Sequence, residues 1–417
     1  MEEVIYQKKE KMRNINRVYW FISQNKFFTK KEIADSLNIS FPTVTKIINL
    51  LLEKKIVIDK GYSKHNVKRK ASLYEYNPNS FYSIGIKLEL SSISFILINL
   101  NGDEIKKTVI IKNFFNDENF VFYIIEELKL FLKNFPHQNL IIGIGISLSG
   151  IVDNKSKILK IGTNFNLFEK NMKIIENTFQ LPIYLINEAN AGAIGEFFLN
   201  RTFEDQNIVF ISIDSGIGAG IVIDGNLYKG HSAKAGEFGH FTVENHGKKC
   251  NCGNEGCLEM YCSNRALIKT FEEEFNISNL NFVEIFSKGL ADTEKGQEIL
   301  DKYTDYLASG IRNLLFLLDL DRVIIGGLIS NYNQYIKNLE RIMHTPAPNP
   351  LTAGEMDEPF HYRRCEQMYR LSHLRSGLRG IPSGTSGLRL PDASHLSAAY
   401  SCDKRGQCLH GHRLPSV

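Results

Sequence analysis

One succession of apolar segments occurs twice in the chain, and it limits the possible folds more than any other feature. Each copy reads as strand, strand, Xaa-Gly hairpin turn and strand, followed by helix-like stretches and further strands. The apolar runs of the first copy are 84–88, 93–100 and 105–111, and those of the second are 208–213, 219–223 and 227–228. The turns are at Asn101-Gly102 and Asp224-Gly225. A duplicated unit of this kind predicts an α/β body of two lobes, with ligands bound between them.

Length and composition are those of a globular protein with more than one domain. The chain has 417 residues and a mass of 47.5 kDa, which at about 150 residues a domain predicts two or three domains. No run reaches the roughly 18 to 20 apolar residues of a membrane span, and Met1-Glu2-Glu3 begins with charge where a signal peptide needs an apolar core. We therefore expect a cytoplasmic protein that does not contact membranes.

Charge is distributed unevenly along the chain. Residues 1–80 carry 16 Lys and Arg against 8 Asp and Glu, whereas residues 81–343 carry 25 against 32. A basic N-terminal head therefore precedes an acidic body. This asymmetry predicts that the head binds a polyanion and the body does not.

The head has the pattern of a winged helix-turn-helix, predicted for residues 1–80. Thr29 and Glu32 form a capping box that begins one helix, and Ser40 is expected to cap the next helix after a short turn. Two short strands follow as a hairpin, the wing. The residues predicted to contact double-stranded DNA are Ser40, Pro42, Thr43, Thr45 and Lys46 at the start of the second helix, and Lys64, Lys68, Arg69 and Lys70 at the wing tip. The alternative is a small helical module that binds a protein partner and carries a solvated basic loop.

Four residues in the loop 240–257 have the spacing of a structural metal site. His240 is followed, after nine other residues, by Cys250, Cys252 and Cys257, and no cysteine precedes Cys250. One imidazole and three thiolates complete a tetrahedral Zn²⁺ site without an open position. The alternative is a group of buried thiols without a metal. A further cysteine, Cys262, is expected to point away from the cluster and to be an ordinary buried residue.

These motifs resemble the ROK family of sugar-responsive repressors and sugar kinases. The resemblance extends over roughly residues 10–343. It is carried by Ala235–His240 with the Cys-Xaa-Cys-Gly-Xaa-Xaa-Gly-Cys-Leu-Glu run, by Asn187–Ala191, by Ser215–Gly220 and by Val323–Gly327. It implies a two-lobed fold of the actin and sugar-kinase type, which is ribonuclease H-like, for residues 81–343. Because only the repressor branch has an N-terminal helix-turn-helix, it implies a repressor of the xylose or N-acetylglucosamine type.

The resemblance also implies a sugar site. The residues that match sugar-contacting positions of the family are Gly150, Asn187, Glu188, Glu237, His240 and Glu259. His240 would use one ring nitrogen for the metal and present the other to the sugar. The alternative for Glu237 and Glu259 is structural support of the zinc loop.

The sites of phosphoryl transfer are less complete. Family kinases have an Asp-Xaa-Gly-Gly-Thr loop after the first strand, where this chain has residues 85–91 without the acid or the paired glycines. Glu188 stands at the position of the catalytic Asp with a side chain longer by one methylene. We therefore predict no catalytic residue and a loss of kinase activity. The Gly216–Gly220 bend is weak evidence for ATP, because glycines also permit a tight turn.

Composition changes abruptly at residue 344. Residues 1–343 use 33 Lys and 8 Arg, whereas residues 344–417 use 1 Lys and 8 Arg and contain 7 of the 11 Pro. Such a segment is either a natural low-complexity tail or the product of a frameshift or fusion join, and we favour the second, which leaves the ROK domain incomplete at its C-terminus.

The sequence thus predicts a sugar-responsive repressor of carbohydrate-utilisation genes that acts as a homodimer or homotetramer on operator DNA. Its rivals are a sugar kinase with an appended head and a protein that does not bind DNA.

Overall fold

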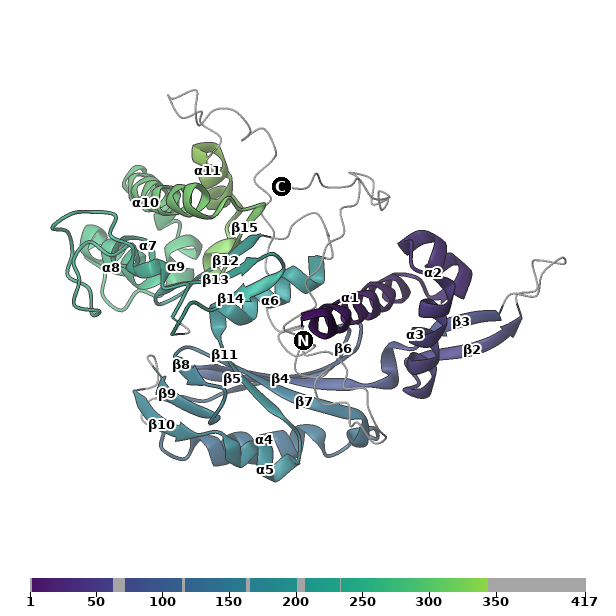
Figure 1. Cartoon of the computed structure of the whole chain (residues 1–417). Coiled ribbons are helices and arrows are strands. Elements are labelled where there is room, and N and C mark those ends of the chain that lie inside the picture. Colours follow the sequence, from purple (N-terminus) through teal and green to yellow (C-terminus); the bar gives the residue numbers. More distant parts are fainter. Residues whose placement is uncertain are drawn as a thin grey trace, which may run out of the picture. The chain divides into compact units, whose positions relative to one another are not determined.

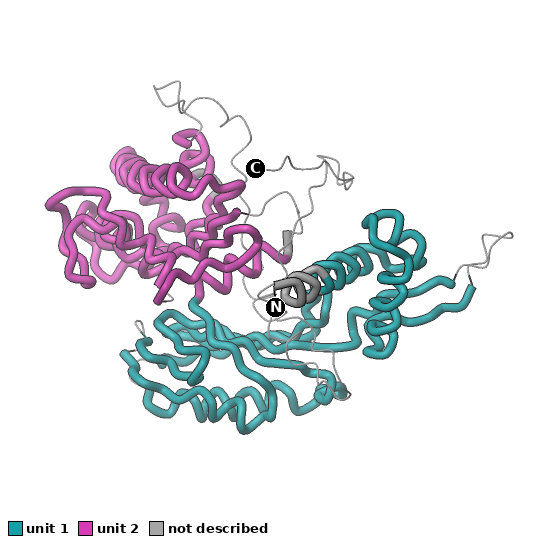
Figure 2. Tube along the Cα trace, viewed as in Figure 1, with its two compact units in different colours: residues 1–187, 201–204, 369–417 teal, residues 188–200, 205–368 magenta. Residues whose placement is uncertain are grey.

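The computed structural model describes residues 2–62, 72–114, 117–162, 166–200, 207–232 and 234–343 (Figure 1). The predicted wing tip, with Lys64, Lys68, Arg69 and Lys70, and the tail 344–417 lie outside these residues. The described chain divides into two compact units (Figure 2): unit 1 extends to Asn187, and unit 2 comprises residues 188–200 and 207–343. The domain boundaries expected at residues 80 and 343 stay predictions. No helix among the described residues is both long and apolar enough to span a membrane.

The head has the predicted order of helices and strands. It comprises α1 (Glu2–Gln24), β1 (Phe27–Phe28), α2 (Lys30–Leu37), α3 (Phe41–Glu53), β2 (Val57–Tyr62) and β3 (Ser72–Tyr76). The three strands pair in the order β1-β3-β2. Thr29 Oγ1 accepts from the Glu32 amide at 3.2 Å, and Glu32 accepts from the Thr29 amide at 2.7 Å. This confirms the predicted capping box.

The predicted cap at Ser40 is only partly correct. Ser40 is the residue before α3, but its side chain makes no hydrogen bond with the backbone of that helix. Its hydroxyl lies 2.8 Å from Thr43 Oγ1. The two hydroxyls therefore bond to each other at the start of α3, which instead begins with the preset backbone of a proline at its second residue.

Unit 1 continues with a five-stranded sheet in the order β11-β7-β4-β5-β6. Its strands are β4 (Tyr82–Glu89), β5 (Ser92–Asn99), β6 (Glu104–Ile111), β7 (Ile141–Leu148) and β11 (Ile183–Asn187). β7 runs parallel to β4 and β11 runs parallel to β7, whereas β5 is antiparallel to β4 and β6 is antiparallel to β5. The helices are α4 (Phe120–Leu132) and α5 (Lys173–Phe179), and the small sheet beside them is β8 (Ile151–Asp153), β9 (Ile158–Gly162) and β10 (Leu167–Asn171). Short 3₁₀ turns are η1 (Pro78–Ser80) and η2 (Gln138–Leu140).

Unit 2 repeats this strand order, which confirms the duplication read from the sequence. Its strands β12 (Ile208–Ile213), β13 (Ile217–Ile223), β14 (Asn226–Tyr228) and β15 (Arg322–Gly326) pair as β14-β13-β12-β15, with β15 parallel to β12. The helices are α6 (Glu188–Asn200), α7 (Glu259–Cys262), α8 (Asn264–Phe275), α9 (Phe282–Ser287), α10 (Glu294–Leu318) and α11 (Asn333–Met343). The 3₁₀ turns are η3 (Phe238–His240), η4 (Leu290–Asp292) and η5 (Leu328–Asn331).

The head and the sheet of unit 1 share a hydrophobic core. Leu100, after β5, and Ile142, in β7, are buried in the same cluster as the apolar residues of α1, α2 and α3. Tyr19 of α1 donates to the Leu100 carbonyl at 3.4 Å, and the Leu100 amide donates to the Pro78 carbonyl at 3.0 Å. Because burial of apolar surface is the main source of stability, the head is part of unit 1 rather than a separately tethered module.

Candidate metal centre and ligand-binding residues

The four predicted metal ligands lie together in unit 2. His240 ends η3, and the three cysteines lie in the loop that leads to α7. One ligand atom from each of the four lies within 4.8 Å of the others. Cys250 Sγ is 3.6 Å from His240 Nδ1, and Cys252 Sγ is 3.6 Å from Cys257 Sγ. Four ligand atoms grouped in this way fit a tetrahedral cation.

The loop reaches this geometry through its glycines and short backbone bonds. Gly253 and Gly256 have φ angles of 92° and 73°, in the left-handed region that favours glycine. A Cβ at Gly256 would lie 1.7 Å from the Glu244 carbonyl oxygen, so no other residue fits there. The Cys250 amide donates to the Asn254 carbonyl at 2.8 Å, which closes the turn between the first cysteines and Cys257. Gly253 and Gly256 thus let the chain wrap around the four ligand residues.

Burial holds two thiols of this cluster in their neutral form unless a positive charge is near. Burial raises the pKa of the Cys250 thiol to about 12 and also raises that of Cys257. A backbone hydrogen bond from Asn254 lowers the pKa of the exposed Cys252. Buried thiols with raised pKa values become thiolates only beside a positive charge, and a divalent ion supplies that charge. Cys262 is fully buried and donates to the Tyr303 carbonyl at 3.3 Å, away from the cluster as predicted.

The two acids next to the cluster occupy different environments. Glu259 has a side chain only 11% exposed, accepts from Cys250 Sγ at 3.2 Å and lies 3.8 Å from His240 Nδ1. Glu237 is 61% exposed and lies 3.8 Å from the other ring nitrogen, Nε2. The imidazole therefore directs Nδ1 toward the thiols and Nε2 toward Glu237. Glu259 thus lies against the cysteine cluster, and the division of the His240 ring between metal and sugar stays a prediction.

Of the remaining predicted sugar residues, Asn187 and Glu188 lie where the chain passes from one unit to the other. Asn187 is the last residue of β11 and of unit 1, and Glu188 is the first residue of α6 and of unit 2. Asn187 pairs with Leu148 on β7, two residues before Gly150. A Cβ at Gly150 would lie 2.1 Å from the Ile161 carbonyl oxygen, so this glycine is required by the small sheet beside it. The six predicted sugar residues are therefore divided between the units: Gly150 and Asn187 belong to unit 1, and Glu188, Glu237, His240 and Glu259 belong to unit 2.

Two glycines of the Gly216–Gly220 bend lie close to atoms of other residues. A Cβ at Gly220 would lie 2.3 Å from the Ala189 carbonyl oxygen, because α6 packs directly on β13. A Cβ at Gly216 would lie 3.0 Å from Glu259 Oε2. Close packing therefore accounts for Gly220, whereas the neighbour of Gly216 is the end of a flexible side chain, which does not by itself require a glycine.

The start of α3 presents part of the predicted DNA-binding set. Ser40, Pro42 and Lys46 are exposed and Thr43 is half-buried. The Thr45 hydroxyl is buried, which makes Thr45 the least suited of the set to contact DNA. The sequence reasoning missed Phe41, whose side chain is 53% exposed at the first turn of α3. Phe41 lies three residues before the buried Val44 and seven before the buried Ile48, which is the spacing of the buried face, so the sequence pattern gave no signal of its exposure.

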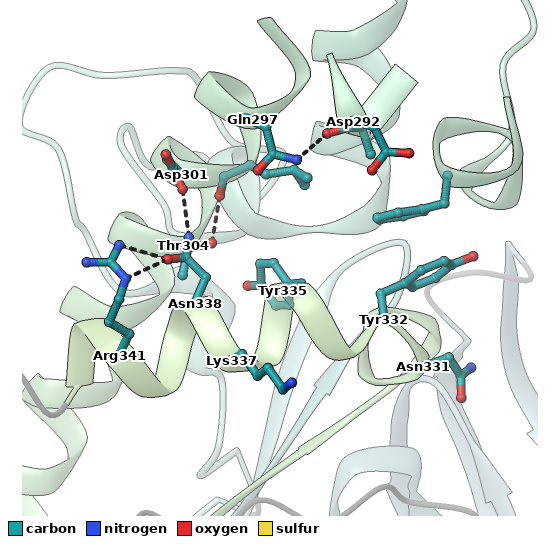
Figure 3. A pocket seen from close by; sticks show the side chains of 13 residues that line it. Asp292, Gln297, Asp301, Thr304, Asn331, Tyr332, Tyr335, Lys337, Asn338 and Arg341 are labelled. Atoms are coloured by element: carbon teal, nitrogen blue, oxygen red, sulfur yellow. Dashed lines mark hydrogen bonds between the residues drawn. The ribbon is translucent and has the colours of Figure 1, made fainter. Parts of the chain in front are cut away.

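A cavity of about 640 Å³ in unit 2 was not predicted from the sequence (Figure 3). It lies between α10 and α11, with Tyr332 stacked on Phe286 at a ring-centroid distance of 3.5 Å. Asn338 on α11 donates to Asp301 on α10 at 2.7 Å and accepts from Arg341 at 2.8 Å. These bonds join the last described helix to α10, so the polar wall of the cavity has a structural role.

Known proteins resemble this chain in sequence and in fold. A family model described as the ROK family matches residues 83–356. The xylose repressor of Bacillus spizizenii is 29% identical over 325 residues, which cover 76% of this chain and 82% of the repressor. The N-acetylmannosamine kinase of Vibrio cholerae is 32% identical over 204 residues, which cover 48% of this chain and 70% of the kinase. The crystal structure of a ROK family transcriptional regulator, a homologue of the E. coli MLC protein, matches with a TM-score of 0.72 at 20% identity and covers 93% of this chain and 96% of that chain.

Proposed function

Because this chain belongs to the ROK family, we propose that it is a sugar-responsive transcriptional repressor that binds operator DNA through its head. The observation that carries the proposal is the winged helix-turn-helix, whose α3 begins with the exposed Phe41, Pro42 and Lys46. Small polar, basic and apolar side chains at the first turn of such a helix suit contacts with phosphates and with thymine methyl groups in the major groove. The xylose repressor match over most of the chain supports the same function.

The metal in this proposal is a structural Zn²⁺ held by His240, Cys250, Cys252 and Cys257. It would neutralise the buried thiolates and fix the His240 ring, whose Nε2 faces Glu237. Bound there, zinc supplies rigidity and no chemical step, because three thiolates and one imidazole leave no open coordination position. Glu237 and His240 would then contact a sugar together with Asn187, Glu188 and Gly150, while Glu259 supports the metal cluster.

Sugar binding would reach DNA through unit 1. The head shares its core with the β4–β7 sheet, and the carboxyl end of that sheet carries Gly150 and Asn187. A sugar that binds two conformations of the protein with unequal affinity would shift the population toward one of them. In a homodimer or homotetramer this shift would move the heads and lower the affinity of the protein for a palindromic operator.

A sugar kinase is the second candidate, because the Vibrio cholerae kinase is 32% identical over about half of the chain. Its activity requires a phosphate-binding loop after β4, where this chain has Glu89-Leu90-Ser91. It also requires a well-placed catalytic base, and at that position this chain has Glu188, whose side chain is one methylene longer than that of the Asp in family kinases. The two functions differ in one measurable respect: a kinase consumes ATP when its sugar is added, and a repressor responds to sugar without ATP.

Fluorescence anisotropy of labelled DNA from the protein's own upstream region tests the proposal. We expect binding that weakens steeply as salt rises, since each phosphate contact contributes about one unit to the slope of log K against log salt. Lys46→Ala should weaken binding and reduce that slope, whereas Lys269→Ala, which removes an exposed lysine of unit 2, should leave both unchanged. A sugar panel without ATP, beginning with xylose, then identifies the effector. Absence of DNA binding by folded, zinc-loaded protein would contradict the proposal.

A further inference from the structure

The cavity between α10 and α11 in unit 2 has the size of a small-molecule site. Its volume of about 640 Å³ lies within the roughly 300–1,000 Å³ of ligand pockets. Residues of α9, η4, α10, η5 and α11 line it, and none of them is a predicted metal, sugar or DNA ligand. Figure 3 shows Tyr332 at one end of the cavity and Arg341 at the other, with Tyr335 between them. The proposed function therefore assigns no role to this cavity.

The floor of the cavity carries a buried hydroxyl group without a partner. Tyr335 is 3% exposed, and its hydroxyl makes no hydrogen bond to any residue that the structure describes. The nearby Thr304 hydroxyl is not in hydrogen-bond geometry with Tyr335, and it donates to the Leu300 carbonyl at 2.6 Å. A buried hydroxyl that stays unpaired destabilises a protein. A ligand oxygen that accepts from Tyr335 would remove this cost, which favours binding.

One wall of the cavity is aromatic. Tyr332 and Phe286 both line the cavity, and their rings stack at a centroid distance of 3.5 Å and an interplanar angle of 19°. This stacking fixes the plane of the Tyr332 ring. Ala291 and Leu300, which are buried, add apolar surface to the floor. A flat apolar wall of this kind favours a ligand that has an apolar ring face.

The rim of the cavity carries charged groups of both signs. It is formed by the exposed residues Asp292, Asp301, Lys337 and Arg341. Asn338 bonds to both Asp301 and Arg341, which fixes that end of the rim. Two carboxylates and two cationic groups carry no net charge, so the rim as a whole attracts neither anions nor cations. Hydroxyl groups both donate and accept hydrogen bonds, and they pair with either kind of rim group.

We propose that this cavity is a second ligand site, which binds a neutral compound with an apolar ring face and several hydroxyl groups, such as a mono- or disaccharide. Tyr335 would donate to a ligand oxygen, and Tyr332 would pack against the ring face. The site goes beyond the proposed function, whose effector lies at Glu237 and His240, and it does not depend on DNA binding. Because the ligand would contact both helices, it would hold α11 against α10.

Hydrogen exchange measured by mass spectrometry on the full chain locates a bound sugar. The probes are xylose, glucose and sucrose, with gluconate as an anionic control and glucosamine as a cationic control. We expect at least one neutral probe to slow the exchange of α11 amides, and the charged controls to slow it less. Glu237→Ala impairs the proposed effector site, so protection of α11 that persists in this variant belongs to the cavity.

Two tyrosines provide matched variants for the affinity, measured by isothermal titration calorimetry. Tyr335→Phe removes the hydroxyl and keeps the ring, so it should weaken binding of the protecting sugar by about 3- to 10-fold, the effect of one hydrogen bond. Its midpoint of thermal unfolding should not fall, because the lost hydroxyl had no partner. Tyr303 is also 3% exposed with an unpartnered hydroxyl, and its ring centroid lies 5.4 Å from that of Tyr335, but it does not line the cavity. Tyr303→Phe should therefore keep the affinity of the unchanged protein.

Three results would overturn the inference. In the first, none of the three neutral sugars slows exchange in α11; if a sugar still releases DNA, the proposed repressor function stays intact. In the second, the protection of α11 disappears in Glu237→Ala, which assigns it to the effector site. In the third, Tyr335→Phe binds the sugar as tightly as Tyr303→Phe does, so that the hydroxyl in the cavity has no part in binding.

Discussion

At the residue scale, the two kinds of buried cysteine in unit 2 should respond differently to the same substitution. Cys257 lies in the His240 cluster. Cys262, five residues after Cys257, instead donates to the Tyr303 carbonyl. Loss of a residue that only hydrogen-bonds to a metal ligand lowers metal affinity by roughly 10- to 100-fold. Because Cys257 is itself a predicted ligand, we expect Cys257→Ser to lower zinc affinity by more than this. The Cys262→Ser variant should keep one zinc per chain. Metal analysis of the purified proteins, with chelator competition, measures both; equal zinc loss in the two variants would contradict the assignment.

Residue-level features differed in how far the sequence predicted them. The spacing from His240 to Cys257 was sufficient to predict the cluster, because metal ligands must be close together and a short loop leaves few other arrangements. The orientation of Thr45 and the exposure of Phe41 were not predicted. Both depend on how α3 is rotated against α1 and α2, and that rotation is fixed by packing between helices rather than by local pattern.

At the scale of single elements, two helices with the same capping chemistry provide a matched comparison. Thr29 with Glu32 begins α2 in the head, and Asn281 with Glu284 begins α9 in unit 2. Replacing either cap residue by Ala should cost about 0.5–2 kcal/mol of helix stability. We expect Thr29→Ala to speed hydrogen exchange of α2 amides and to weaken operator binding.

The control is Asn281→Ala, which should speed exchange in α9 and leave operator affinity unchanged. Weaker DNA binding by both variants to the same degree would indicate that the loss is global and not a property of the head.

The strands were the most predictable elements. The Asn101-Gly102 and Asp224-Gly225 dipeptides predict hairpin turns, and the apolar runs beside them are too short for helices. The sequence pattern was therefore sufficient to predict the hairpins of β5 with β6 and of β13 with β14. The cavity between α10 and α11 had no such signal. It is made by side chains from η4, η5 and the two helices, such as Asp301 and Asn338, which come together only once unit 2 is folded.

At the scale of the whole molecule, the shared core of the head and the unit 1 sheet is the connection through which a ligand would act on DNA. The charge asymmetry of the sequence separated a basic head from an acidic body, but it could not show that Leu100 and Ile142 of the body are buried among head residues. Long-range packing of this kind leaves no periodic pattern in either segment.

Leu100→Ala should weaken this connection. The change removes a side chain that is 3% exposed in the head cluster, and such truncations cost about 2–5 kcal/mol. The helix-turn-helix itself keeps its own core of Ile33, Val44 and Ile48. We therefore expect the variant to bind operator DNA, but to respond less to the effector, because movement of the unit 1 sheet no longer repositions the head.

A second truncation distinguishes lost coupling from lost stability. Leu132 of α4 is similarly buried, at 5%, in the core of the unit 1 sheet and outside the head cluster. Leu132→Ala should lower the midpoint of thermal unfolding to a similar extent while the effector still releases DNA. Anisotropy titrations of both variants with and without effector measure the response at matched stability. A head that responds fully in Leu100→Ala would show that the effector signal reaches DNA by a route other than this core.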